Sequence, residues 1–457
     1  MKKIWLFIAA IAVISCKNEA QIDYAVVSGK IMNKGVSELT INSMDRSFKK
    51  IVNVLEDGSF EDTLRVKKGI YKLHDGKNIT EVYIDAGNMV NISYDATDFS
   101  KTLTITGIGS EISNYLYAKG IKEKKMRGEG TSVYELKEMP YKAKFSEIKT
   151  ALEQLIDSTE GISEEFKVKE RRGLNYYYLG KLNIYESYHA HYTKNSEFKI
   201  SEGFLDELKE LTYEIEEDFI FSTDYKNIVT SHFYDEASKL AEKDSIAEDI
   251  AFLKAAGAVS NEFIKNSLLY NNAKYSVTYT DDLEMFYNTF NELSTNETHK
   301  KEIADSYNKL ISVFKGQPSP KFVDYENYAG GTTSLDDLKG KYVYVDVWAT
   351  WCGPCKREIP FLKDIEKKYH GKNIEFVSIS VDKAKDHDKW LKMVKEKELK
   401  GIQLFSDKDW ESDFVKGYLI KGIPRFILID PTGTIVNSNA PRPSEDKLID
   451  TFNELGI

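Results

Sequence analysis

The chain has 457 residues, so it is too long for one ordinary hydrophobic core and predicts two to four domains. Hydrophobic residues make up 41% and aromatic residues 12% of the sequence, which excludes a largely disordered protein. The net charge of −10 disfavours nucleic acid as a partner, because nucleic-acid-binding proteins present a basic surface. An acidic balance by itself mainly confers solubility, so it identifies no partner.

The first residues carry the pattern of an export signal. Lysines precede an apolar run over residues 4–14, which is too short to cross a bilayer as a helix. The run ends near Cys16, and Val13-Ile14-Ser15-Cys16 resembles the cleavage box of bacterial lipoproteins. This resemblance implies a signal peptide over residues 1–15, a lipid on Cys16 and a tether over residues 16–23. An ordinary secretory signal that contains a cysteine is the alternative.

The remaining cysteines form one closely spaced pair. The sequence contains three cysteines, Cys16, Cys352 and Cys355. If Cys16 carries lipid, no thiol remains for a structural disulfide with either member of the pair. Exported chains normally use cysteines in structural disulfides, so a lone pair spaced for exchange favours catalysis. No later stretch is apolar over the roughly 18 residues that a transmembrane helix needs, and we expect a lipid anchor instead.

Residues 24–106 have the pattern of β-structure. Runs of β-branched and aromatic residues, such as 24–31, 60–66 and 89–94, are separated by turn signals such as Asp57-Gly58. Strands at this spacing predict a small β-sandwich.

Residues 110–315 predict helices. Of the protein's nine prolines only Pro140 precedes Pro318, and Leu, Glu, Lys and Ala are frequent between them. Apolar residues recur at a spacing of three to four in several segments, which are 141–157, 164–192, 247–269 and 281–293. We therefore predict a central helical domain.

One predicted helix carries a face of tyrosines, which comprises Tyr178, Tyr185, Tyr188 and Tyr192. Their rings form either an aromatic wall of a substrate groove or tyrosine-rich packing against neighbouring helices. His189 and His191 point in different directions on such a helix, so we do not expect them to bind a metal. No Cys/His cluster elsewhere has zinc spacing.

A linker rich in helix breakers, residues 316–320, precedes a segment in which strands and helices alternate. The predicted strands are 322–325, 342–348, 374–381, 426–429 and 434–437, and the predicted helices are 355–369, 385–397 and 444–455. This mixture of βαβ units and a hairpin is what a thioredoxin fold requires. The sequence thus predicts a multidomain protein with an N-terminal all-β sandwich, a central all-α domain and a C-terminal α/β thioredoxin-like fold over residues 317–457.

A redox-active dithiol is predicted where the strand over residues 342–348 ends. Cys352 and Cys355 lie three residues apart at a predicted helix N-terminus, where Pro354 fits because its missing N–H has no partner there. The thiolate is the attacking species, and a helix N-terminus lowers the thiol pKa from about 8.5. Cys352 is the predicted nucleophile, whereas Cys355 is expected to be more buried and to resolve the mixed disulfide. A zinc half-site or a passive disulfide is the alternative.

The residues around this pair resemble a known family. WATWCGPCK resembles the active-site signature of thioredoxin-fold proteins, and Cys352-x-x-Cys355-x-x-Glu358-x-Pro360 is similar to the TlpA/ResA-like thiol-disulfide reductases. The resemblance covers residues 317–457 and includes FVSISVD and KGIPRFILID. The β-pattern before it resembles a module of unknown function that is found ahead of such reductases in Bacteroidetes-type lipoproteins.

Two acidic residues are further candidates at this site. Asp346 interrupts an apolar strand, where a carboxylate is costly to bury. It corresponds to the buried acid of thioredoxins, which is proposed to take the proton of the resolving cysteine; a partly exposed structural aspartate is the alternative. The resemblance implies that Glu358 lies near the dithiol and influences its titration. A solvent-facing carboxylate at the helix N-terminus is the alternative for Glu358.

Substrate-binding residues follow from the same resemblance. Pro424 matches the cis-proline of the fold, whose preceding residue, here Ile423, offers strand-like backbone hydrogen bonds to a substrate; a trans proline is the alternative. Arg425 stands where thioredoxins commonly carry threonine, and this departure adds charge near the thiols or alters substrate choice. The predicted substrate-binding set is Trp351, Gly353, Pro354, Ile423, Pro424 and Arg425.

These features predict an envelope-anchored thiol-disulfide oxidoreductase that faces the periplasm and uses no bound cofactor or metal. The Gly-Pro pair between the cysteines resembles the reducing members of the family, so protein disulfides are the expected substrates. A reductase in an oxidising compartment needs electrons, which implies a membrane thiol donor as partner. A disulfide isomerase or oxidase is one alternative, and a binding or scaffold lipoprotein with a regulatory redox head is another.

Overall fold

The computed structural model describes residues 22–44 and 48–457, and it divides into two compact units. The first unit contains the residues up to Leu211 together with Phe221–Ile228, and the second contains Thr212–Ile220 and Val229–Ile457. The helical region is therefore shared between the units. The predicted signal peptide and the lipid site at Cys16 lie outside the described residues. Among the residues that are described, no helix is long and apolar enough to cross a membrane.

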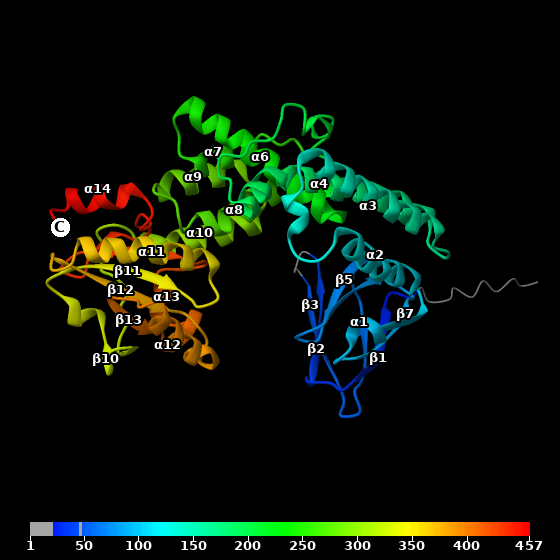
Figure 1. Cartoon of the computed structure of the whole chain (residues 1–457), viewed down its shortest axis with the longest axis horizontal. Coiled ribbons are helices and arrows are strands. Elements are labelled where there is room, and N and C mark those ends of the chain that lie inside the picture. Colours follow the sequence, from blue (N-terminus) through cyan, green and yellow to red (C-terminus); the bar gives the residue numbers. More distant parts are fainter. Residues whose placement is uncertain (1–21, 45–47) are drawn as a thin grey trace, which may run out of the picture. The chain divides into compact units, whose positions relative to one another are not determined.

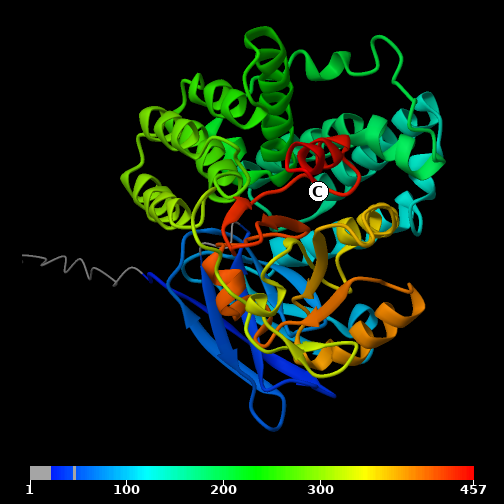
Figure 2. The same cartoon turned by 90° about the vertical axis from the view of Figure 1, so that its left-hand side faces the viewer.

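The first unit begins with two four-stranded sheets around a shared core (Figure 1 and Figure 2). One sheet has the order β4-β1-β7-β8 and the other the order β3-β2-β5-β6. Gly29 pairs with Ile92 between β1 and β7, and a Cβ at Gly29 would lie 1.8 Å from the Ile92 carbonyl oxygen, so only glycine fits there. The strands are β1 (Ala25–Met32), β2 (Glu38–Ser43), β3 (Lys49–Asn53), β4 (Ser59–Leu64), β5 (Gly69–His74), β6 (Ile79–Ile84), β7 (Met89–Asp95) and β8 (Thr104–Ile108), with the short helix α1 (Phe99–Thr102) before β8.

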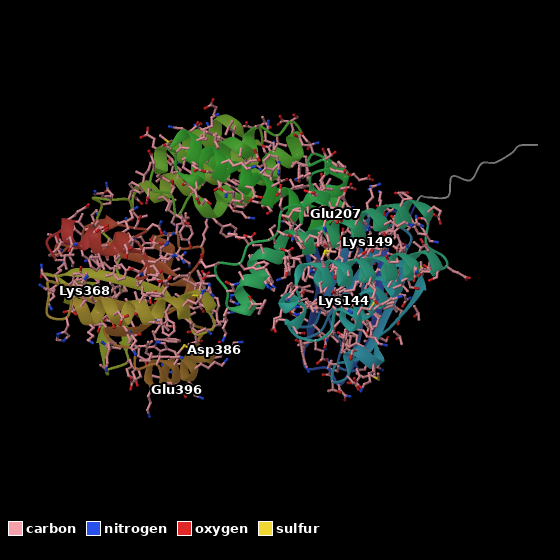
Figure 3. All side chains as sticks on the ribbon, turned by 45° about the horizontal axis from the view of Figure 1, so that its top comes forward. Lys144, Lys149, Glu207, Lys368, Asp386 and Glu396 are labelled. Carbon is pink, nitrogen blue, oxygen red and sulfur yellow. A yellow bond between two sulfur atoms is a disulfide. The ribbon has the colours of Figure 1, made fainter. Side chains whose placement is uncertain are left out.

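Helices follow the sandwich. The first unit contains α2 (Glu111–Arg127), α3 (Glu138–Ser158) and α4 (Glu164–Thr193), whereas α5 (Glu216–Phe221) and α6 (Thr223–Asp244) are divided between the two units. The tyrosine face of α4 packs against its surroundings: the Tyr185 ring lies 4.4 Å from that of Tyr141 on α3. Tyr178 donates a hydrogen bond to Glu207 and lies beneath Lys149, and Figure 3 labels both of these charged residues. The packing interpretation of this face therefore holds for these two rings.

The second unit contains the helices α7 (Glu248–Gly257), α8 (Glu262–Ser276), α9 (Leu283–Leu293) and α10 (Glu297–Ile311). The segment 247–269, in which apolar residues recur at helical spacing, forms two helices, because the chain breaks between α7 and α8. Asn261 ends the break: its side chain accepts a hydrogen bond from the N–H of Ile264 and thereby caps α8. The apolar spacing in the sequence continues across this break, so it did not indicate that a new helix begins after Asn261.

A seven-stranded mixed sheet follows, with the order β10-β9-β13-β12-β11-β14-β15. The strands are β9 (Tyr325–Asn327), β10 (Thr332–Thr333), β11 (Tyr342–Trp348), β12 (Ile374–Ser380), β13 (Ile402–Phe405), β14 (Arg425–Ile429) and β15 (Ile435–Asn437). Strand β11 lies inside the sheet, since it pairs in parallel with β12 and antiparallel with β14. Its residues from Val343 to Trp348 are all buried, which explains why the strand reads as a continuous apolar run.

Helices cover this sheet. They are α11 (Gly353–Lys368), α12 (His387–Glu396), α13 (Asp413–Gly417) and α14 (Asp446–Glu454). One core unites Leu362 of α11 and Phe452 of α14 with Tyr344 of β11, so α11 and α14 share a face of the sheet (Figure 1). The predicted multidomain organisation, with β-sandwich, helices and a thioredoxin-like α/β part, is confirmed.

Candidate active site

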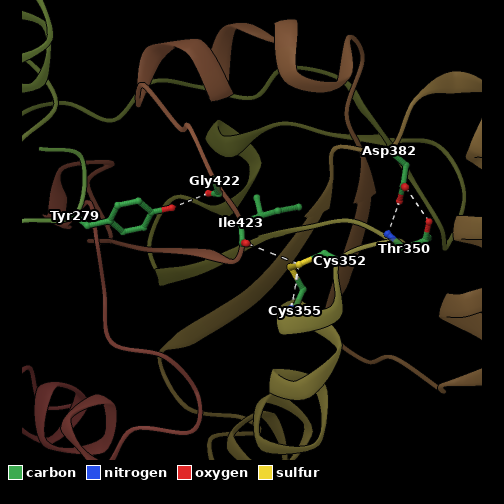
Figure 4. The surroundings of a disulfide bond; sticks show 7 residues. All are labelled: Tyr279, Thr350, Cys352, Cys355, Asp382, Gly422 and Ile423. Atoms are coloured by element: carbon green, nitrogen blue, oxygen red, sulfur yellow. Dashed lines mark hydrogen bonds between the residues drawn. A yellow bond between two sulfur atoms is a disulfide. The ribbon is translucent and has the colours of Figure 1, made fainter. Parts of the chain in front are cut away.

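The cysteine pair lies where strand β11 ends and helix α11 begins. Strand β11 ends at Trp348, and Cys352 is the residue that caps α11 (Figure 4). Cys352 and Cys355 form a disulfide, with 5.3 Å between their Cα atoms. The backbone N–H of Cys355 donates to Cys352 Sγ at 3.1 Å. An amide donor and a helix N-terminus both stabilise a negative sulfur, so the geometry favours Cys352 as the thiolate.

Burial does not distinguish the two cysteines. Cys352 is 3% exposed and Cys355 is 4% exposed, so the prediction that Cys355 is the more buried residue is wrong. The two residues differ instead in their position on the helix, because only Cys352 receives an N–H from the first turn. Of their neighbours, Trp351 is 58% exposed and Pro354 is also exposed, whereas Gly353 is partly buried.

The loop before β14 reaches the same end of the sheet. Val347 of β11 pairs with Arg425 of β14 in an antiparallel register, so the residues before Arg425 lie beside those after β11. The peptide bond between Ile423 and Pro424 is cis, as the resemblance implies. The carbonyl oxygen of Ile423 lies 3.8 Å from Cys352 Sγ, within reach of a thiol S–H.

Asp346 lies beneath the dithiol on the face of the sheet that α11 covers. Its side chain lines a cavity of about 10 Å³ together with Cys355, which leaves room for roughly one water molecule. Burial, together with the nearby carboxylates of Glu366 and Glu358, raises the pKa of Asp346 to about 8. Its Oδ1 atom is buried and accepts no hydrogen bond from the described part of the chain. A carboxyl with this pKa is protonated in most molecules at pH 7, and it becomes the ionised form, which can accept a proton, as the pH rises towards and beyond 8.

Glu366 is a second carboxyl at this cavity, and the sequence reasoning missed it. Partial burial raises the pKa of Glu366 to about 7, whereas the charges of Lys363 and Lys400 lower it. Glu366 comes one turn after Leu362 and directly after Ile365, both in the apolar core. A charged residue on that face of the helix was the signal that could have identified it.

Glu358 does not face solvent. It is 8% exposed, and its carboxylate accepts hydrogen bonds from the N–H and the hydroxyl of Ser444, both at 3.1 Å. Ser444 precedes α14, so Glu358 ties α11 to the loop before the last helix. Its predicted influence on the thiols stays a prediction.

The turn before Cys352 is held by Asp382, a second residue that the sequence reasoning missed. Asp382 follows β12 and is fully buried. Its carboxylate accepts hydrogen bonds from the N–H and the hydroxyl of Thr350, both at 2.8 Å, and from Ser380 (Figure 4). The only signal in the sequence was an acidic residue at the end of a buried strand.

Arg425 is buried rather than displayed beside the thiols. It is 2% exposed, and burial lowers the pKa of its guanidinium to about 10. Its Nη1 donates to Asn439 Oδ1 at 3.1 Å, and its guanidinium lies 4.1 Å from the ring centre of Tyr279. A direct contact of Arg425 with substrate stays a prediction.

The histidines and acids that the structure describes do not gather into a metal site. Within residues 22–44 and 48–457, no group of three or more His, Cys, Asp or Glu side chains is arranged to hold a metal ion. His189 bonds the carbonyl oxygen of Tyr134 through Nδ1 at 2.8 Å and packs on the ring of Phe198.

Comparison with known proteins places the similarity in the C-terminal part. The Redoxin family model matches residues 314–454. The thiol-disulfide oxidoreductase ResA of Bacillus thuringiensis subsp. konkukian is 30% identical over 133 residues, which are 29% of this chain and 73% of that protein. ResA of Bacillus subtilis is 28% identical over 142 residues, 31% of this chain and 76% of that protein. A solution structure of a candidate thiol-disulfide oxidoreductase from Bacteroides vulgatus is 53% identical and covers 32% of this chain and 92% of its own, with a TM-score of 0.28.

Proposed function

We propose, from the premise that the chain belongs to the ResA-like thiol-disulfide oxidoreductases with a Redoxin domain, that it reduces disulfides in other proteins. The observation that carries this proposal is the position of Cys352. Its sulfur caps α11, accepts the Cys355 N–H and lies next to the Ile423 carbonyl oxygen. The Gly353-Pro354 pair between the cysteines supports the reducing direction, since it resembles the reducing members of the family.

The exchange starts with the reduced pair. The Cys352 thiolate attacks one sulfur of a substrate disulfide, so that a Cys352–substrate disulfide forms and the other substrate sulfur leaves as a thiolate. Cys355 then loses its proton and attacks Cys352 Sγ. The Cys352–Cys355 disulfide forms, and the second substrate sulfur leaves as a thiolate that takes a proton from solvent. Two electrons have passed from the dithiol to the substrate.

Asp346 is the proposed acceptor of the Cys355 proton. Both side chains line the same small cavity. The carboxyl titrates at about 8 and a free thiol near 8.5, so moving the proton between them costs about 0.7 kcal/mol at 1.36 kcal/mol per pH unit. Such a match of pKa values is what general base catalysis requires.

The substrate is proposed to bind across the exposed surface around Cys352. Trp351 and Pro354 supply exposed apolar area on one side, and the backbone of Ile423 before Pro424 supplies strand-like hydrogen bonds on the other. At Gly353 a Cβ would meet only Arg357 Nη1, at 4.0 Å, so the surface beside Cys352 is open there.

The location is also a proposal. Support comes from the lipoprotein-like pattern ending at Cys16, which implies a lipid anchor in the cell envelope, a domain that faces the periplasm and a membrane thiol that returns electrons to the dithiol. Metabolic labelling with palmitate tests this: the wild-type chain should carry the label, and a Cys16→Ser variant should not.

The central experiment is a pair of variants of the full chain. Reduced wild-type protein should reduce insulin, Cys352→Ser should not, and Cys355→Ser should accumulate mixed disulfides with its substrates. A Cys352→Ser variant that reduces insulin at the wild-type rate would contradict the proposal. A reduction potential well above the ~−270 mV of thioredoxin would favour an isomerase or oxidase instead.

A further inference from the structure

The turn between α8 and α9 contacts the loop that carries the cis-proline, and both lie in the second unit. The hydroxyl of Tyr279 donates a hydrogen bond to the carbonyl oxygen of Gly422 at 2.9 Å (Figure 4). Gly422 precedes Ile423, whose own carbonyl oxygen lies 3.8 Å from Cys352 Sγ. Two consecutive carbonyl groups therefore connect the turn to the nucleophile: that of Gly422 accepts from Tyr279, and that of Ile423 lies beside Cys352 Sγ.

The absence of a side chain at Gly422 makes this contact possible. A Cβ at this position would lie 2.9 Å from the Tyr279 hydroxyl oxygen, which is closer than real Cβ contacts come. Gly422 is not among the residues with positive φ, so its backbone conformation does not itself demand glycine. Glycine here provides room for the tyrosine.

Further contacts join the end of α8 and the turn after it to segments on both sides of the cis-proline loop. Before it, Lys421 Nζ donates to the carbonyl oxygen of Lys274 at 2.8 Å. After it, Asn439 Nδ2 donates to the carbonyl oxygen of Tyr279 at 2.7 Å. Arg425 lies against the Tyr279 ring, where a cation–π contact and the bond to Asn439 compensate part of the cost of its burial.

The turn that carries Tyr279 is itself firmly held. Val277 is 1%, Thr278 6% and Thr280 8% exposed, so its backbone is anchored among buried neighbours. The N–H groups of Tyr279 and Thr280 both donate to the carbonyl oxygen of Ser276, at 2.8 and 3.0 Å. A hydroxyl on such a support can restrain the loop that it contacts.

We propose that Tyr279 is a positioning residue for the cis-proline loop and that it favours extended polypeptide disulfides as substrates. By restraining Gly422 it fixes the orientation of the next peptide group, with which an extended substrate segment pairs. A small disulfide makes no such backbone pairing and does not depend on it. This inference rests on the proposed reductase function, and it gives the helices of the second unit a part in substrate choice.

The test compares two substrates with the full chain. Insulin supplies a polypeptide disulfide, and 5,5′-dithiobis(2-nitrobenzoic acid) supplies a small one. Tyr279→Phe removes the hydroxyl. Gly422→Ala keeps the hydroxyl but displaces it from the Gly422 carbonyl oxygen, because the added Cβ would lie 2.9 Å from the hydroxyl oxygen. Tyr275→Phe is the matched control, because Tyr275 lies at the end of α8, four residues before Tyr279, and is 51% exposed.

Tyr279→Phe and Gly422→Ala should each lower kcat/KM for insulin about 3- to 10-fold, mainly through KM, as expected for the loss of one hydrogen bond. The kcat/KM for the small disulfide in both variants, and for both substrates in the Tyr275→Phe control, should stay within about twofold of wild type. The reduction potential should be unchanged. Unchanged insulin kinetics in both variants, or equal losses for both substrates, would overturn the inference alone. A wild-type protein that reduces neither substrate would refute the proposed function and the inference with it.

Discussion

Replacing Asp346 by asparagine should stabilise the thioredoxin-like part at neutral and alkaline pH. Burial raises the pKa of Asp346 to about 8 from an ordinary value of 3.8. The unfolded chain therefore loses this proton near pH 4, whereas the folded protein keeps it until about pH 8. Between these values, the free energy of unfolding falls by about 1.4 kcal/mol for each pH unit, because only the unfolded state ionises.

The size of the effect follows from the two pKa values. Below about pH 4 the carboxyl is protonated in both states, and Asp346→Asn should change stability little. At pH 7 the penalty is (7 − 3.8) × 1.36, or about 4 kcal/mol, and above pH 8 it levels off near 6 kcal/mol. Asparagine has nearly the same shape and no charge, so it should recover most of this free energy.

Tryptophan fluorescence provides the assay. The described tryptophans are Trp348, Trp351, Trp390 and Trp410, and all of them lie in the thioredoxin-like part. Urea unfolding of the full mature chain, followed by this signal between pH 4.5 and 8.5, therefore reports on that part. Asp364→Asn on the exposed side of α11 is the matched control and should show no such gain. A stability difference between Asp346→Asn and wild type that does not grow with pH would refute the reasoning.

Three other substitutions around the dithiol have defined outcomes. The rate of insulin reduction should rise with pH as Asp346 ionises. Glu366→Gln removes a charge that raises the pKa of Asp346, so this rise should move to lower pH, and an unchanged pH profile would exclude this coupling. Asp382→Ala leaves buried donors of Thr350 unpaired and should cost about 3 kcal/mol or more in urea unfolding, whereas a loss below about 1 kcal/mol would contradict the role given to it. Glu358→Ala removes two hydrogen bonds to the loop before α14 and should cost about 1.5–3 kcal/mol, and an unchanged urea midpoint would contradict this.

Residues that act over short distances along the chain were predictable. The pair Cys352 and Cys355 follows a run of apolar residues and precedes a helix, so spacing alone placed both thiols at a helix N-terminus. Asp346 was identified because one acid in an apolar strand is costly wherever the strand is buried. Pro424 required the resemblance, since no local rule distinguishes a cis proline from a trans one in a loop.

Contacts between distant segments were not predictable. Glu366 shares a cavity with Asp346, Asp382 holds Thr350, and Tyr279 bonds Gly422 across 143 positions of the chain. None of these pairs leaves a pattern in the sequence, because each depends on which strands and helices become neighbours.

The sequence by itself determined the dithiol, its strand and its helix, because hydrophobic periodicity and helix-end chemistry act within a few residues. Only the tertiary structure decided what surrounds Cys352. The register of β11 with β14 brings the Ile423 carbonyl oxygen to its sulfur, and the packing of the helical turn on that loop brings Tyr279 to Gly422. Both arrangements arise from strand pairing and from the burial of apolar surface between segments far apart in the chain.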